Sequence, residues 1–242
     1  MDNRLSLLER LASAVLLAWC TGCLAQAEAP KSAYPSMAPL QSYLMASRDE
    51  EIALARSAAP PSISGNSEVL VLGAHGYETA VKGTNGFVCF VQRSWAASFS
   101  DPDFWNPRLR GPNCFNSIAA RSELPQYLQR TKWVLGGATR QQMIDSTQAA
   151  VASHQFKDPE SGALSFMLSK EGYLGDAAGG PWLPHVMFFL PHGQTANWAA
   201  GLQGSPIIGQ EGSAIESTVL FIPVRSWSDG SPAPQPVAKH AM

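Results

Sequence analysis

The sequence predicts an α+β domain, an antiparallel sheet of about five to six strands with helices packed on it. Helical patterns are grouped at 36–59 and 122–154, and strand-like patterns are grouped at 68–93 and 163–224. An Asn-Gly dipeptide at 85–86 lies between two β-rich runs, which is typical of a hairpin. Strands joined by hairpins, with helices grouped together, favour this class over alternating β-α units with a parallel sheet.

The first 27 residues have the pattern of a cleaved signal peptide. Arg4 and Arg10 precede an apolar run at 11–19, and Ala25-Gln26-Ala27 supplies the small residues of a cleavage site. The alternatives are a short buried helix or a membrane anchor, but the apolar run is shorter than the ~20 residues that span a bilayer. We expect cleavage after Ala27, export to the periplasm or beyond, and no transmembrane segment in the mature chain. The proline-containing stretch 28–35 is expected to be a linker.

The four cysteines form two pairs with different expected fates. Cys20 and Cys23 fall inside the expected signal peptide, where a lipoprotein anchored at Cys23 is an alternative outcome. Cys89 and Cys114 remain after cleavage. In an oxidising compartment such a pair predicts one disulfide, and two buried free thiols are the alternative.

Local signals define elements along the rest of the chain. Ser36 with Pro39 predicts a first helix start, and Ser47 followed by three acidic residues predicts a second, ended by Pro60-Pro61. The Asn85-Gly86 turn predicts a type I′ hairpin over 77–93. Its register places Glu78 opposite Arg93 as a cross-strand ion pair. Residues 94–118 are rich in Trp, Pro and Asn and show no period. The remaining predicted elements are a strand at 68–73, helices at 122–135 and 139–154 (the second with a Thr139-Gln142 capping box), and strands at 163–169, 185–190 and 218–224. We therefore expect a single domain over 36–227 and a flexible tail over 228–242.

Composition limits the classes of partner. The chain has 242 residues, a net charge of -2 and 15% charged residues, against about 25% in typical domains. Since there is no run of Lys or Arg, nothing in the sequence would neutralise a phosphate backbone, and we expect no nucleic-acid partner. The expected partner is an unidentified small molecule or an envelope protein.

No familiar catalytic motif is present, so candidate residues come from loops at strand ends. The expected ligand-binding residues, near the aromatic loops 94–114 and 171–185, are Tyr173, Asp176, Trp182, His185 and His75. We expect no cofactor and no metal; a metal site would have to combine His185, His192 and His75 with Glu78 or Asp176. The leading hypothesis is a binding domain for a small molecule or partner. The alternative is a hydrolase or metal-dependent enzyme centred on His185 with Asp176 or His75, and a third possibility is a structural envelope protein.

Two resemblances add to this interpretation. The order of elements is similar to that of exported PAS-like and profilin-like domains, an analogy of architecture that carries no chemistry. Several peptides resemble those of an uncharacterised family of exported bacterial proteins; they lie at 51–64, 83–89, 104–107, 173–176 and 184–189. That resemblance implies export and a single domain, and it brings no activity, cofactor or catalytic residue.

Overall fold

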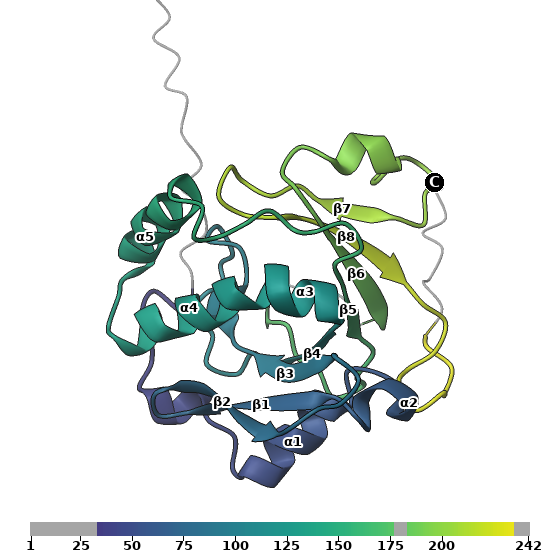
Figure 1. Ribbon diagram of the computed structural model, residues 1–242, viewed down its shortest axis with the longest axis horizontal. Helices are drawn as coiled ribbons and strands as arrows, with labels where there is room; N and C mark the ends of the chain where they lie inside the picture. Colours follow the sequence, from purple (N-terminus) through teal and green to yellow (C-terminus); the bar gives the residue numbers. More distant parts are fainter. Residues whose placement is uncertain (1–32, 177–182, 235–242) are drawn as a thin grey trace, which may run out of the picture. The chain divides into compact units, whose positions relative to one another are not determined.

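An eight-stranded mixed sheet organises the chain, with helices on both of its faces (Figure 1). The computed structural model describes residues 33–176 and 183–234. In spatial order the strands are β2 (Gly76–Val81), β1 (Glu68–Gly73), β3 (Val88–Gln92), β4 (Gly111–Phe115), β5 (Leu164–Met167), β6 (His185–Leu190), β8 (Thr218–Pro223) and β7 (Ile208–Gln210). Neighbouring strands are antiparallel except β1 and β3, which are parallel. The α+β class is confirmed, and the sheet is larger than the expected five to six strands.

The helices begin close to the residues that the sequence indicates. They are α1 (Arg48–Arg56), α2 (Pro61–Ser64), α3 (Ser117–Ser122), α4 (Leu124–Leu135) and α5 (Arg140–Ala152), with short 3-10 turns η1 (Leu40–Tyr43), η2 (Ser94–Ala96) and η4 (Thr195–Trp198). Ser47 caps α1 by accepting a hydrogen bond from the Glu50 N–H, and Thr139 with Gln142 forms the predicted capping box. The expected helix after Ser36 is only the turn η1, and Pro61 opens α2 instead of ending the helical region.

The predicted hairpin over 77–93 is wrong. β2 pairs with β1 through a turn at Gly73–Gly76, and β3 lies on the other side of β1, so β2 and β3 do not touch as neighbours. A type I′ turn needs positive φ at both central residues, but only Gly86 has it (φ 77°). The Asn85 side chain instead accepts from the Phe87 N–H and donates to the Ile63 carbonyl, which fixes an open loop beside α2.

The predicted ion pair between Glu78 and Arg93 is also wrong, because the two residues lie on strands that are not paired. Exposed Glu78 bonds to Arg48 of α1. Arg93 is fully buried, and its Nη2 donates to Glu51 Oε1 of α1 at 2.9 Å. Its Nε also donates to the Tyr43 carbonyl at 2.8 Å, so the guanidinium joins α1, η1 and the end of β3.

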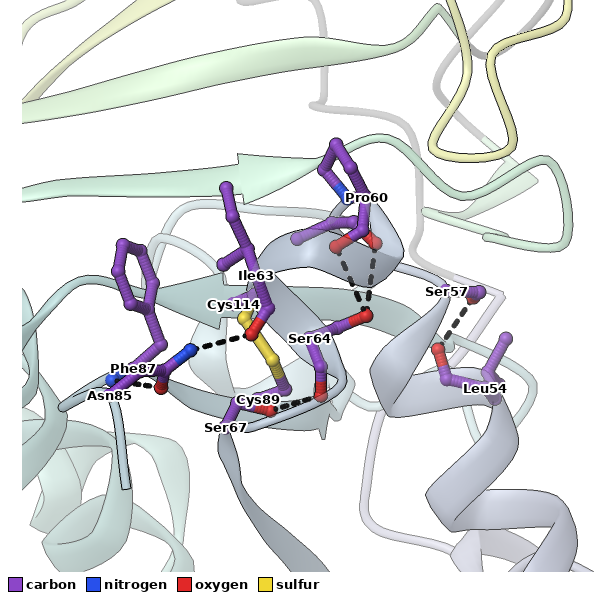
Figure 2. The surroundings of a disulfide bond; sticks show 11 residues. Leu54, Ser57, Pro60, Ile63, Ser64, Ser67, Asn85, Phe87, Cys89 and Cys114 are labelled. Atoms are coloured by element: carbon purple, nitrogen blue, oxygen red, sulfur yellow. Dashed lines mark hydrogen bonds between the residues drawn. A yellow bond between two sulfur atoms is a disulfide. The ribbon is translucent and has the colours of Figure 1, made fainter. Parts of the chain in front are cut away.

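The stretch expected to be irregular contains strand β4, which brings the two cysteines together. Cys89 and Cys114 are directly opposite each other on β3 and β4, and the structure contains the predicted disulfide between them. Both residues are fully buried. Figure 2 shows the sulfur bridge beneath α2, close to Ile63 and Ser64.

The sheet separates two apolar layers. The layer against α1 and α2 contains the disulfide, Val69, Val91 and Leu54. The layer against α3 and α4 contains Phe90, Phe115, Met187 and Phe189, with Leu124 of α4 packed on them. A third cluster, around Tyr43, Trp95, Phe104, Trp105 and Met143, fastens η1 and the loop after β3 to α4 and α5. The tryptophans of that loop therefore fill the interior.

The described chain keeps hydrogen bonds to its last residues. Trp227 N–H donates to Ser231, and Ala233, which is buried, donates to Arg225. Within residues 33–176 and 183–234, no helix has the length and apolar character needed to cross a bilayer.

Candidate functional site: a pocket beside α4

Two of the predicted site residues lie together, in a cluster on the surface. The Asp176 carboxylate accepts hydrogen bonds from Tyr34 (2.7 Å), from Arg108 Nη2 (2.5 Å) and from Tyr173. Arg108 and Asp176 are about half exposed or more, with side-chain exposures of 62% and 47%. The hydroxyl bonds of Tyr173 and Tyr34 lower the pKa of Asp176. Because these groups already satisfy one another, the cluster serves to attach the segment before η1 to the loop after β5.

The other predicted residues do not join that cluster. His185, the first residue of β6, is 8% exposed; its Nδ1 lies 2.9 Å from the Leu183 carbonyl and its ring packs on Phe221. Burial lowers its pKa, so the ring is neutral at pH 7. His75 lies in the β1–β2 turn, with β3, β4 and β5 between it and β6. Trp182 lies outside the described residues.

The histidines are not gathered into a metal centre. His192 lies 3.6 Å from Glu211, away from the His75 turn. In the part of the chain that the structure describes, no three His, Cys, Asp or Glu side chains are grouped so that they could hold a metal ion.

A pocket of about 210 Å³ lies between α4, the sheet and two loops. Its apolar side is formed by alternate residues of three strands: Met167, Met187, Phe189, Val219 and Phe221. Met187 faces Phe221 and Phe189 faces Val219 in the register of β6 and β8, so these side chains project to one face of the sheet. His185 belongs to the same face of β6, next to the pocket but not among its lining residues.

The polar side of the pocket comes largely from one face of α4 and its N-terminus. Glu123, Gln126, Tyr127 and Arg130 all line it, at the spacing i, i+3, i+4 and i+7 that places residues on one side of a helix. The Tyr127 ring packs edge-on against Phe90 and Phe115. Its hydroxyl has no hydrogen-bond partner among the described residues, so it is available to a molecule in the pocket.

Arg130 forms the back of the polar side. The residue is 7% exposed; its Nη1 donates to the Ala97 carbonyl at 2.9 Å, and its Nη2 lies 3.4 Å from Glu216 Oε1. The guanidinium also stacks on Phe99, with Cζ 4.0 Å from the ring centroid. Its buried Nε has no partner among the described residues. Burial lowers the pKa of Arg130, and the Glu216 carboxylate acts in the opposite direction.

Two further carboxylates on the pocket wall are well supplied with donors. Glu216 accepts from the Phe99 N–H (2.9 Å) and from the hydroxyls of Ser98 and Ser213. Glu211 accepts from the Thr195 hydroxyl (2.6 Å), from Thr218 and from backbone N–H groups of the loop after β6. These hydrogen bonds lower the pKa of Glu211 to about 2, so it is ionised at neutral pH.

Glu123 differs from both of them. It is 3% exposed, and the Ser217 hydroxyl is the hydrogen-bond donor to its two oxygens, at 3.3 and 3.1 Å. Burial raises the pKa of Glu123 to about 7, with smaller opposing effects of the Ser217 bond and of Arg130. A buried carboxyl that titrates near neutrality in a pocket is typical of a functional site.

The pocket overlaps the two predicted aromatic loops only in part. Ala96–Ser98, Asp101, Leu109 and Leu174 come from those loops and line it. The groups that define its chemistry, Glu123, Tyr127, Arg130 and Glu216, were not among the predicted site residues. One sequence signal points to three of them: a helix that covers a sheet normally has apolar residues at i, i+4 and i+7, and here these positions hold Glu, Tyr and Arg.

Comparison with known proteins gives no family, relative or structural neighbour: no family model, no curated protein and no solved structure matches this chain.

Proposed function

We propose that this is an exported domain that binds a small molecule in the pocket beside α4. One observation carries the proposal: an apolar wall from the sheet faces polar side chains of Glu123, Tyr127 and Arg130 across one hollow. Small-molecule sites generally combine a largely apolar lining with a few convergent polar groups. The volume of about 210 Å³ is below the usual range for drug-sized ligands, which favours a small metabolite.

The hydrolase alternative centred on His185 gains no support from the described geometry. His185 is buried against Phe221, Asp176 is engaged with Tyr34, Tyr173 and Arg108, and His75 lies three strands away. A catalytic base must reach its partner within hydrogen-bond distance or through one water, and no such pair is formed by these residues in the described part of the chain.

A variant that fills the pocket tests the proposal. Gln126 is half-buried, lines the pocket and has no side-chain hydrogen bond to the described residues, so Gln126→Trp should occupy the space without breaking a network. Gln129→Trp, on the same helix but outside the pocket lining, is the matched control. We expect a metabolite screen by thermal shift and NMR to give ligands for the wild type and the control, and none for Gln126→Trp. Equal binding by all three proteins would rule out this pocket.

Export is proposed on separate grounds. The buried disulfide and the lack of a spanning helix in the described ranges are both compatible with it. Mass spectrometry of the native protein should find Glu28 at the N-terminus and Cys89 linked to Cys114. An intact Met1 with two free thiols would contradict export.

A further inference from the structure

The charges that line the pocket are strongly unequal. Among the described lining residues, four are acidic and one, Arg130, is basic; the acidic ones are Asp101, Glu123, Glu211 and Glu216. Arg130 is already engaged with Glu216, with the Ala97 carbonyl and with the Phe99 ring. An anion entering the pocket would therefore meet excess negative charge at short range.

The acidic residues also differ in how well they are satisfied. Glu211 and Glu216 each accept hydrogen bonds from several donors, whereas both oxygens of Glu123 share the single hydroxyl of Ser217. A carboxylate can accept about four hydrogen bonds. Glu123 thus has unused acceptor capacity in a buried position beside the pocket, and a charged donor would form a strong bond there.

The apolar part of the pocket lining suits the hydrophobic part of a ligand that carries such a charged donor. The rings of Phe189, Phe221 and Tyr127 line the pocket together with two methionines of β5 and β6. Aromatic faces attract cations, and they also pack against apolar groups. The polar and apolar halves therefore both fit a molecule that has a positive end and a hydrophobic end.

We propose that the pocket binds a small organic ammonium ion, with its charged nitrogen at Glu123 and its apolar body against the aromatic wall of β6 and β8. This inference rests on the proposed function, because it names the class of ligand for the same pocket. Anions should then not bind in the pocket, and neutral molecules should bind with lower affinity than cations.

Binding of such a cation is coupled to pH. Glu123 takes up a proton as the pH falls below about 7, and the ammonium group must then displace that proton. The charged and titratable groups around Glu123 are Arg130 and Tyr127 on α4, Asp158 before β5, and Glu216. Burial also raises the pKa of Asp101 on the opposite loop. Affinity for the cation should fall about tenfold from pH 8 to pH 6.

Three matched series of fragments test the inference. Each series has the same apolar bodies (phenylethyl, cyclohexylethyl and indolylethyl) and ends in an ammonium, a hydroxyl or a carboxylate group. We expect ligand-observed NMR and calorimetry at constant ionic strength to show the ammonium series binding about tenfold tighter than the alcohols at pH 8, and no binding of the carboxylates. Calorimetry in buffers of different ionisation enthalpy should detect proton release at pH 6 and none at pH 8.

Glu123→Gln supplies the decisive variant. It should weaken binding of the ammonium series about tenfold at pH 8, remove the pH dependence and leave the alcohols unchanged. Glu171→Gln, which changes an exposed carboxylate outside the pocket lining, should behave as the wild type. Equal binding of ammonium and alcohol fragments, abolished in both cases by Gln126→Trp, would overturn the ligand class and keep the pocket. Preference for carboxylates would also overturn the class. No binding by any series would overturn the pocket as a small-molecule site.

Discussion

The two halves of the sheet are covered in different ways. β2, β1, β3 and β4 form a helix-covered half, with α1 and α2 on one face and α4 on the other; the apolar layer under α3 and α4 extends to Met187 and Phe189 of β6. β5, β6, β8 and β7 form a loop-walled half of the sheet (Figure 1). Residues of the loops at 96–101 and 210–217 line the pocket beside it. In the first half the buried charge of Arg93 is fully paired. Beside the second half, Glu123 and the Nε of Arg130 keep unused hydrogen-bonding capacity. We therefore propose that the first half is the structural support and that the second carries the binding site.

The largest effect is expected from breaking the buried pair of the helix-covered half. Arg93→Met leaves the Glu51 carboxylate buried without its cation, which typically costs about 3–5 kcal/mol of unfolding free energy. Chemical denaturation measures this loss of unfolding free energy. The double variant Arg93→Met/Glu51→Leu should recover part of the loss. Arg121→Met breaks an exposed pair with Glu160 and should cost much less than Arg93→Met, because solvent screens that pair. Equal costs for the two single variants would contradict the comparison.

The disulfide is the next largest contribution to the same half. Cys89 and Cys114 are separated by 25 positions, and cross-linking a loop of this length stabilises a protein by about 3 kcal/mol in the chain-entropy model. Cys89→Ala/Cys114→Ala should lower the unfolding free energy by that amount, as measured with denaturant. Wild-type protein held in strong reductant should have the same unfolding free energy as the variant. A variant as stable as the oxidised wild type would show that the disulfide does not stabilise the fold.

Glu123 should show the opposite behaviour, because its substitution is expected to stabilise the protein. A carboxyl whose pKa rises from 4.5 to about 7 on folding favours the folded state fully below pH 4.5, and this contribution is lost as the pH rises through 7. Relative to the wild type, Glu123→Gln should gain up to about 3 kcal/mol at pH 8 and almost nothing at pH 4. Unfolding curves at the two pH values give the difference. The same stability difference between variant and wild type at both pH values would show that Glu123 does not titrate near neutrality.

The smallest change in stability is expected from filling the pocket. Gln126→Trp should stay within about 0.5 kcal/mol of the wild type while it removes ligand binding. Thermal unfolding and the fragment assay on one preparation separate the two effects. If stability and ligand binding both fall in this variant, the loop-walled half also supports the fold. The proposed separation of support and binding between the two halves would then be wrong.

The fold was predictable where the signals are local. The caps at Ser47 and Thr139, strand β6 and the disulfide partners follow from residue types at short spacing. The hairpin prediction failed because Asn85-Gly86 and the Gly73–Gly76 turn both satisfy local rules. Which of these turns joins two paired strands depends on β1 being buried between β2 and β3. That position is a property of the whole sheet.

The site was less predictable, for two reasons. β4 begins Gly-Pro-Asn, residues that strands generally avoid, so the loop before it looked longer than it is. The pocket itself joins α4 to the loop that contains Glu216, 86 positions after Arg130. No local pattern links those two segments. Of the expected ligand-binding residues, Tyr173 and Asp176 contact each other in the structure, whereas His75 and His185 lie apart because they were grouped only by residue type.

The bridge between β3 and β4 has a consequence for the continuity of the main chain. It closes a covalent ring that includes exposed Arg108 and the wall residues Ala97 and Ser98. A tryptic cut after Arg108 would leave two fragments that migrate as one species until a thiol reagent separates them. The bridge therefore keeps the two parts of the chain covalently joined after a cut anywhere between Cys89 and Cys114.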